Sequence, residues 1–383
     1  MRVYLVAGEM SGDALGAALM AGLKSLAPEA VFKGVGGADM CREGLETLFP
    51  MEELSLMGIA EVLPSLRHLL RRRDEVVADV LAWKPDVLIT IDSPDFGLRV
   101  ARKVRERCPD IRTVHYVAPT VWAWRPGRAT KMARYIDHVL ALFPFEPPYM
   151  EAAGMDCDFV GHPVVSAKVA SEHDAMEFRA AHGISGEMLL VLPGSRSGEA
   201  SRLLGRFGAA VRQIVEARPG LRVVVPAALP VAGMVGQEVR RWAGDPVILD
   251  PREMKPDVFE ASKRAAFSAA DGALAASGTV SLELAANDTP MIIGYDMGWI
   301  SRQIIPRMLK IDTFTLVNLV SETRAVPEFI GKACRAPAIA QAVCKMLDEP
   351  DTQREALRLT LERLGKGGEA PGLRAARAVL KRL

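Results

Sequence analysis

The chain has 383 residues, of which 49% are hydrophobic and 25% are charged, and its formal net charge at pH 7 is +1. This length exceeds one ordinary hydrophobic core, so we expect two domains, and the composition excludes an intrinsically disordered chain. A near-neutral charge balance also excludes a dedicated nucleic-acid binder unless basic residues are segregated locally.

Cysteine usage and hydropathy predict a cytoplasmic protein. The five cysteines, at positions 41, 108, 157, 334 and 344, include no CxxC pair and no metal-like spacing, which is typical of reduced thiols. An apolar strand follows Met1 at once and leaves no room for a signal peptide. No apolar run approaches the roughly 20 residues that span a bilayer.

A strand, a glycine-bearing turn and a helix open the chain. Val3 to Ala7 predicts the strand, Gly8 to Asp13 the turn, and leucines at 15, 19, 23 and 26 one face of the helix. The turn is neither a P-loop nor a G-x-G-x-x-G motif. Glu9 stands at the carboxyl end of the strand, so we expect it to face the ligand crevice of a parallel sheet. A second strand, Val31 to Lys33, follows.

The segment from Leu54 to Arg73 combines a dense apolar set with a basic end. It contains Leu66, Leu69 and Leu70 and then Arg71, Arg72 and Arg73. One interpretation is a core helix with a solvated basic end. The other is a membrane-docking surface made of these six residues, because apolar side chains beside a cationic rim suit a lipid interface.

Val87 to Ile91 is an unbroken apolar run that ends at Asp92. A run without polar alternation predicts a strand covered on both faces, as in a parallel sheet. Ligands of such sheets bind beyond the carboxyl ends of the strands, where Asp92 stands. Alternatively, Asp92 only caps a helix that begins near Asp95.

The next strand, Arg112 to Val117, leads into a loop rich in aromatic and basic residues. Trp124 and Arg125 lie in this loop, within the sequence His115-Tyr-Val-Ala-Pro-Thr-Val-Trp-Ala-Trp-Arg125. Aromatic faces with guanidinium donors suit a sugar ring or a phosphorylated ligand, whereas a packed lid over the sheet edge is the alternative. A further strand, His138 to Phe143, follows, and Gly161-His162-Pro163 marks a domain boundary.

The second half restarts the strand–turn–helix pattern. Met188 to Leu192 predicts a strand, after which Ser195 and Arg196 begin a helix that runs to about Arg218 and contains Glu199. A helix N-terminus with Ser and Arg is a ready anion site. A second anion cradle is expected where a strand from Gly272 to Ala275 leads into Ser277, Gly278 and Thr279, one turn before Glu283.

The remaining elements complete a two-domain α/β protein. Further strands are expected at Leu221 to Pro226, Val247 to Leu249 and Pro290 to Tyr295. We expect an N-terminal acceptor-binding Rossmann-like domain, residues 1–164, and a C-terminal nucleotide-sugar-binding one, residues 165–349. The helices from about 350 to 383 are expected to pack back on the N-terminal domain or on a partner subunit.

Several motifs together resemble the lipid-A-disaccharide synthase family. They are Ala7-Gly-Glu-Met-Ser-Gly-Asp13, Met51-Glu-Glu-Leu-Ser-Leu-Met-Gly-Ile-Ala-Glu-Val62, Ile91-Asp-Ser-Pro-Asp-Phe96, the Trp-Ala-Trp-Arg125 loop, Pro144-Phe-Glu146, Val160-Gly-His-Pro163, Leu192-Pro-Gly-Ser-Arg196 and Ala276-Ser-Gly-Thr279. They are spread in order over nearly the whole chain. The departures are Gly97, where an Asn is usual, and Ala200, where a bulkier apolar residue is usual.

The resemblance implies an inverting glycosyltransferase of GT-B architecture, with two Rossmann-like domains that face each other across a cleft. It implies transfer of 2,3-diacylglucosamine from its UDP conjugate to 2,3-diacylglucosamine 1-phosphate, which gives a β-1,6-linked disaccharide. By that likeness Asp92 is the general base, Glu9 supports the acceptor site and Arg196 neutralises the diphosphate. Ser195 and the 277–279 turn also bind phosphate, and Glu283 and Asn318 lie near the nucleotide. No cofactor is implied. The expected location is the inner face of the inner membrane, with a homodimer as one arrangement.

Two competing functions stay open at this stage. A sugar-nucleotide epimerase of the same architecture needs acid and base groups but no acceptor, and a non-catalytic nucleotide-sugar-binding protein releases no UDP. Asp156-Cys157-Asp158 has the form of the DxD metal motif of other glycosyltransferases. It lies at no expected strand end, so we expect no metal site there.

Overall fold

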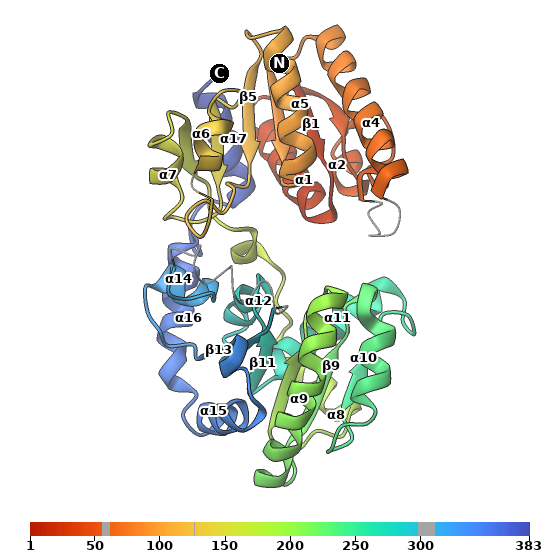
Figure 1. Cartoon of the computed structure of the whole chain (residues 1–383), viewed down its shortest axis with the longest axis vertical. Helices are drawn as coiled ribbons and strands as arrows, with labels where there is room; N and C mark the ends of the chain where they lie inside the picture. Colours follow the sequence, from red (N-terminus) through yellow and green to blue (C-terminus); the bar gives the residue numbers. More distant parts are fainter. Residues whose placement is uncertain (56–61, 126, 298–310) are drawn as a thin grey trace. The chain divides into compact units, whose positions relative to one another are not determined.

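The computed structural model describes residues 1–55, 62–125, 127–297 and 311–383. The chain divides into two compact units (Figure 1): unit 1 is Met1–Ser166 with Gly367–Leu383, and unit 2 is Ala167–Lys366. Each unit contains one parallel sheet with helices on both faces, so the expected α/β class with two Rossmann-like domains is confirmed. No helix in the described part of the chain is long and apolar enough to span a bilayer.

Unit 1 is built on a seven-stranded parallel sheet in the order β3-β2-β1-β4-β5-β6-β7. All five residues of β4 are buried, because helices cover this strand on both sides. The strands are β1 Arg2–Ala7, β2 Val31–Val35, β3 Glu46–Thr47, β4 Val87–Ile91, β5 Arg112–Tyr116, β6 His138–Ala141 and β7 Asp156–Phe159.

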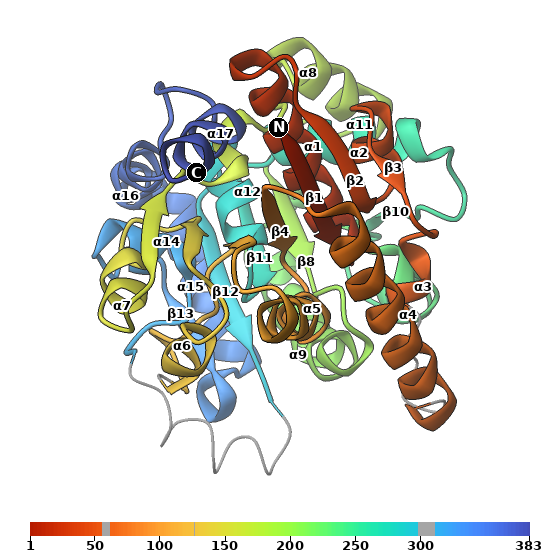
Figure 2. The same cartoon turned by 90° about the horizontal axis from the view of Figure 1, so that it is seen from above.

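The helices of unit 1 form two layers. α1, α2 and α17 cover one face of the sheet, and α4 and α5 cover the other (Figure 2). The helices are α1 Met10–Leu26, α2 Ala38–Arg42, α3 Glu52–Ser55, α4 Val62–Trp83, α5 Pro94–Arg107, α6 Gly127–Met132, α7 Pro147–Glu151 and α17 Pro371–Lys381.

The last helix, α17, is part of unit 1 although unit 2 precedes it in the chain. It packs on α1 at a crossing where a Cβ at Gly22 would lie 2.7 Å from the Gly372 oxygen, and one at Gly372 would lie 2.5 Å from the Ala18 oxygen. Both glycines are therefore needed for this close approach. Helix α16, Asp351–Arg363, instead packs on α12 and α14 within unit 2. The expectation that residues 350–383 return as one block is thus wrong for α16, whose buried face is used inside unit 2.

Unit 2 has a six-stranded parallel sheet in the order β10-β9-β8-β11-β12-β13. Its helices α9, α10 and α15 cover one face, and α8, α11 and α12 cover the other (Figure 2). The strands are β8 Met188–Leu192, β9 Arg222–Pro226, β10 Val247–Leu249, β11 Gly272–Ala276, β12 Met291–Tyr295 and β13 Glu328–Ile330. The helices are α8 Glu172–Ala181, α9 Ser197–Ala217, α10 Ala232–Val239, α11 Pro256–Ala269, α12 Val280–Ala286, α14 Leu316–Ser321, α15 Ala336–Asp348 and α16.

Candidate functional site

The strand order of each sheet reverses direction at one position, which is where open α/β sheets bind ligands. In unit 1 this switch point lies between β1 and β4, and in unit 2 it lies between β8 and β11. In unit 1, Glu9 follows β1 and Asp92 follows β4. In unit 2, Ser195 and Arg196 follow β8, and residues 277–279 follow β11. Each sheet therefore brings together residues that are about 80 positions apart in the sequence.

Asp92 is held at the unit 1 switch point by an unusual backbone. Its φ is +50° and that of Ser93 is +36°, so both residues adopt the left-handed conformation. The Ser11 hydroxyl at the start of α1 donates a hydrogen bond of 2.9 Å to Oδ2 of Asp92. Helix α5 begins at Pro94 with Ser93 as its N-cap residue, so the alternative that Asp92 caps this helix is wrong.

Two glycines bring the start of α1 close to the end of β4. A Cβ at Gly8 would lie 2.8 Å from the Ser93 hydroxyl, and one at Gly12 would lie 3.3 Å from the Ile91 oxygen. Glu9 is exposed beside them and accepts a hydrogen bond of 3.4 Å from the Ser93 hydroxyl. Two carboxylates and two hydroxyls therefore meet at this edge. No local pattern in the sequence predicts the role of Ser11, because its partner is 81 residues away.

The aromatic loop after β5 presents one tryptophan and buries another. Trp124 is 38% exposed, and the Arg125 guanidinium lies 4.2 Å from the centroid of its ring. Arg125 has a φ of +52°, which turns the chain so that the pair stays at the surface. Trp122, in contrast, is buried. The lid alternative describes Trp122, whereas Trp124 and Arg125 offer a flat apolar surface with a cation.

The unit 2 switch point has different chemistry. Ser195 and Arg196 are exposed, and Arg196 is the N-cap residue of the 21-residue helix α9. The first N–H groups of a helix have no acceptor within it and carry the positive end of its dipole. Together with the guanidinium, they form a site suited to a phosphate or diphosphate.

Glu199 lies inside this turn. A Cβ at Gly194, whose φ is +102°, would be 2.1 Å from Oε2 of Glu199, so only glycine leaves room for the carboxylate. Burial raises the pKa of Glu199, while Arg196 and hydrogen bonds from the backbone at Ser195 and Arg196 favour its charged form. These contacts indicate that Glu199 braces the turn. Its contact with a ligand stays a prediction.

The second turn of unit 2 contains Ser277, Gly278 and Thr279. Thr279 is the N-cap residue of α12, and the Ser277 hydroxyl donates to the Phe314 oxygen at 3.3 Å. Glu283 lies one turn further and forms an ion pair of 3.2 Å with Lys263 of α11. Because α12 has only seven residues, its N-terminus contributes less to an anion site than that of α9.

Asn318 is in the interior of unit 2. It is 1% exposed, its Nδ2 donates to the Val326 oxygen at 2.9 Å, and its Oδ1 accepts from the Val326 N–H at 3.0 Å. The position of this residue near the nucleotide stays a prediction. Both amide atoms are used to fix the chain around residue 326.

Two of the three arginines that are predicted to face the membrane form ion pairs with acidic side chains. Arg72 donates twice to the Glu53 carboxylate, at 2.8 Å each, and Arg73 pairs with Asp74 at 2.8 Å. Their charges are thus matched by acidic neighbours. Arg71 is exposed and contacts the His68 ring.

The leucines of this segment are only partly covered. Leu66 is 44% exposed, and Leu69 and Leu70 are half-buried. The second half of α4 packs in the core through valines at 76, 77 and 80. The core-helix interpretation therefore holds for that half, while Leu66 keeps an exposed apolar side chain. Residues 56–61 of the same motif lie outside the described residues.

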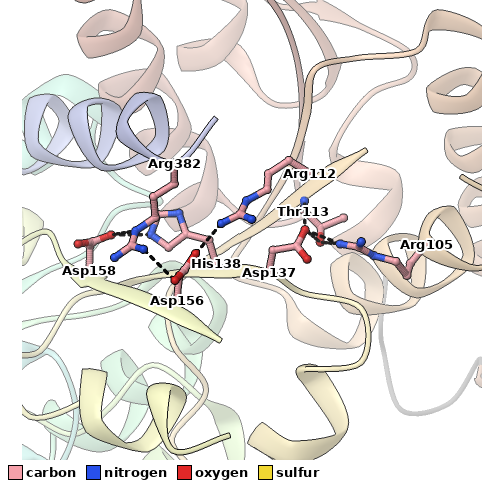
Figure 3. Close-up of polar contacts among 8 residues, drawn as sticks. All are labelled: Arg105, Arg112, Thr113, Asp137, His138, Asp156, Asp158 and Arg382. Carbon is pink, nitrogen blue, oxygen red and sulfur yellow. Dashed lines mark hydrogen bonds and ion pairs between the residues drawn. The ribbon is translucent and has the colours of Figure 1, made fainter. Parts of the chain in front are cut away.

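Asp156 and Asp158 are occupied by basic partners (Figure 3). They lie in β7, a strand that the sequence did not predict. Asp156 is its first residue and therefore lies at the amino ends of the parallel strands, whereas the switch point lies at their carboxyl ends. Asp156 pairs with Arg112 at 2.6 Å and with Arg382 at 2.8 Å, and Asp158 pairs with His138 at 2.9 Å and with Arg382 at 2.6 Å. The two carboxylates hold the end of α17. Within the described ranges, no cluster of three or more His, Cys, Asp or Glu residues could hold a metal ion.

Known proteins resemble this chain over its whole length. The family model of lipid-A-disaccharide synthetase matches residues 3–370. Lipid-A-disaccharide synthase of Ruegeria pomeroyi is 59% identical over 384 residues, which cover 100% of this chain and 96% of the relative. The synthase of Rhodospirillum centenum is 44% identical and covers 99% and 94%, respectively.

Solved structures share the fold at low identity. A putative UDP-N-acetylglucosamine 2-epimerase from Listeria monocytogenes has a TM-score of 0.67 at 13% identity, covering 99% of this chain and 94% of that one. MurG of Acinetobacter baumannii has a TM-score of 0.55 at 13% identity, covering 100% and 99%. At these identities the likeness concerns the fold alone.

Proposed function

Because the chain belongs to the lipid-A-disaccharide synthase family, a family of lipid A glycosyltransferases, we propose that it joins two acylated glucosamines. The donor is UDP-2,3-diacylglucosamine, the acceptor is 2,3-diacylglucosamine 1-phosphate, and the products are the β-1,6-linked disaccharide 1-phosphate and UDP. The observation that carries the proposal is the pair of switch points, one with carboxylates and one with a diphosphate-type anion site.

Asp92 is the general base in this proposal. Its carboxylate takes the proton of the acceptor 6-hydroxyl while that oxygen attacks the anomeric carbon of the donor. The bond from the anomeric carbon to the diphosphate oxygen breaks at the same time, and its electron pair leaves with UDP. The configuration at that carbon is therefore inverted. Glu9, linked to Asp92 through Ser93, supports the acceptor sugar.

The unit 2 switch point receives the departing charge. Arg196 and the N-terminus of α9 stabilise the diphosphate as its charge grows, with Ser195 and the 277–279 turn as further donors. These groups remove the need for a metal ion. Glu283 accepts hydrogen bonds from the ribose hydroxyls, as its half-exposed position allows. Glu199 and Asn318 act by shaping the chain around these groups.

Two further parts of the proposal concern the lipid. Trp124 and Arg125 contact the ring and the phosphate of the acceptor, because they combine a flat apolar face with a cation. Leu66, Leu69, Leu70 and Arg71 dock unit 1 on the inner face of the inner membrane, where acylated substrates reside. A homodimer is part of the same proposal and is tested by the mass of the protein in solution.

The direct test is incubation of the full chain with both lipid sugars and mass spectrometric detection of products. The proposal requires a disaccharide 1-phosphate and an equal amount of UDP, both dependent on acceptor. An altered sugar without acceptor would instead indicate an epimerase, the activity named for the Listeria structure. Absence of UDP with retained donor affinity would indicate a binding protein.

A further inference from the structure

Glu146 is a buried carboxylate that the proposed reaction does not use. It is 2% exposed and lies at the start of α7, just after β6. Its Oε2 accepts hydrogen bonds from the backbone N–H groups of Leu142 and Phe143, at 3.0 Å each. Its Oε1 accepts the indole N–H of Trp122 at 3.3 Å. One side chain thus ties the β6–α7 connection to the aromatic loop after β5.

The carboxylate costs free energy where it lies. Burial raises the pKa of Glu146 to about 7, against the three N–H donors, which favour its charged form. A hydrophobic residue would fill the same space without that cost. Retaining a carboxylate there points to a requirement for its two acceptor oxygens.

Trp122 is the part of the loop that Glu146 holds. It is 7% exposed and meets the Phe145 ring edge to face at a centroid distance of 5.0 Å. Two residues later, Trp124 is 38% exposed and bonds only within its own loop, to the Thr120 hydroxyl at 3.2 Å among the described contacts. The loop is therefore fixed at Trp122 and open at Trp124.

The loop backbone needs such a fixed point. Val117, where it begins, has a φ of +84°, and Arg125 has a φ of +52°. A left-handed β-branched residue is costly, so the surrounding contacts must hold it in place. The Val117 N–H donates to the Leu140 oxygen of β6 at 3.0 Å, and among the described contacts the link from Trp122 to Glu146 is the side-chain hydrogen bond that ties the rest of the loop to a different element.

We propose that Glu146 is a positioning residue for the acceptor site: through Trp122 it sets the place at which Trp124 and Arg125 meet the acceptor sugar phosphate. The inference rests on the proposed function of this pair. Glu146 is buried in unit 1 and acts only through the loop. Its loss therefore weakens acceptor binding and leaves the donor site of unit 2 intact.

Two substitutions break the link from opposite sides. Glu146→Gln keeps the shape but leaves one acceptor oxygen for two sets of donors, so an amide N–H₂ must face a donor. Trp122→Phe keeps an aromatic ring at this place, removes the indole N–H and also leaves the side chain smaller, a loss of volume that the control must share. The matched control is Trp242→Phe in unit 2, because Trp242 is equally buried and its indole N–H has no partner among the described residues.

Two readouts separate positioning from general stability. The first is hydrogen–deuterium exchange of residues 117–125. The second is the Kd of the acceptor, measured by calorimetry in detergent micelles, together with KM for each substrate. We expect faster exchange in the loop and an acceptor Kd and KM raised about tenfold in both variants, with donor KM unchanged. The double variant should be no worse than either single one, since both remove one link.

Unchanged loop exchange in both variants would overturn the inference, as would an unchanged acceptor Kd despite faster exchange. A drop in thermal stability with equal losses for donor and acceptor would assign Glu146 to the core alone. If the wild type binds acceptor but forms no disaccharide, the proposed reaction fails, and the acceptor Kd and the exchange still decide the role of Glu146.

Discussion

The two switch points share one topology and have opposite chemistry. In unit 1 the carboxylates of Asp92 and Glu9 follow the strand ends, and a carboxylate can accept a proton. In unit 2 the strand ends lead to Arg196 and a helix N-terminus, which favour an anion. A parallel sheet supplies the place, and the two or three residues after each strand decide the ligand. Substitutions at the two switch points should therefore affect different steps of the reaction.

The largest effect is expected for Asp92→Asn. The amide preserves size and accepts the Ser11 hydrogen bond, but it does not take a proton. We expect kcat to fall about 10²–10⁴-fold with donor affinity and folding unchanged, as measured by initial rates of UDP release. Rates near that of the wild type would transfer the role to Glu9.

A somewhat smaller loss is expected for Arg196→Gln in unit 2. Removing a charge that stabilises the departing diphosphate typically costs about 10²–10³-fold in kcat, and here UDP affinity should fall as well. Arg202→Gln is a matched control, because Arg202 is also exposed on α9 but nearly two turns further along, where it donates to the Asp296 oxygen. Equal losses in both variants would show only a general effect of charge.

Acid should destabilise unit 1 more than unit 2. Burial lowers the pKa of His115, His138 and His162 to about 4, against 6.5 in an unfolded chain. Between these values the unfolded chain binds more protons than the folded one. The free energy of unfolding therefore decreases as the pH is lowered. From pH 7 to pH 5 each histidine costs about 2 kcal/mol.

Glu146 works in the opposite sense. Its pKa of about 7 in the folded state lies above the ordinary 4.5, so between pH 7 and pH 5 the folded state takes up a proton that the unfolded chain does not. This uptake stabilises the folded state by about 2 kcal/mol and offsets part of the loss from the histidines. The net loss for unit 1 is about 4 kcal/mol between pH 7 and pH 5. Chemical denaturation at the two pH values measures it, and His162→Gln should reduce the difference by about 2 kcal/mol. A pH-independent stability would contradict these assignments.

A smaller effect is expected at the membrane. Arg71→Gln should weaken binding to anionic vesicles by about 1 kcal/mol, and Leu66→Ser by up to about 1.5 kcal/mol. Arg72→Gln is the contrasting variant, because its charge is already matched by Glu53. Vesicle co-sedimentation with rising salt measures all three. Equal losses for Arg71→Gln and Arg72→Gln would contradict the expectation that the paired charge of Arg72 contributes little to docking.

No effect is expected from chelation. If Arg196 and α9 hold the diphosphate, turnover in EDTA should equal turnover in Mg²⁺. Loss of activity in EDTA that Mg²⁺ or Mn²⁺ restores would show that unit 2 needs a metal ion to hold the donor.

The sequence predicted the interior strands of both sheets and one edge strand, β10, but it missed the other three edge strands. Val87–Ile91 and Met188–Leu192 were predicted with their observed bounds, because buried parallel strands are continuous apolar runs. The strands β3, β7 and β13 were missed. Each is an edge strand of two to four residues with little burial, so no apolar run marks it.

The candidate site could be predicted from the sequence where a residue follows a strand, but its long-range contacts could not. Asp92 and Arg196 stand directly after apolar runs or their turns, so strand prediction also located them. The Ser11–Asp92 and Trp122–Glu146 contacts join segments that are distant in the sequence. The ion pair of Arg72 with Glu53 likewise has no local signal in the sequence. Asn318 has no local signal for burial, because its partners are backbone groups of a later loop.

The most direct test compares Asp92→Asn and Arg196→Gln side by side, with kcat and the Kd of UDP measured for each. Separate roles for the two switch points predict that Asp92→Asn loses turnover and keeps the wild-type Kd, whereas Arg196→Gln loses turnover and binds UDP more weakly. A weakened UDP Kd in Asp92→Asn, or an unchanged one in Arg196→Gln, would contradict that separation.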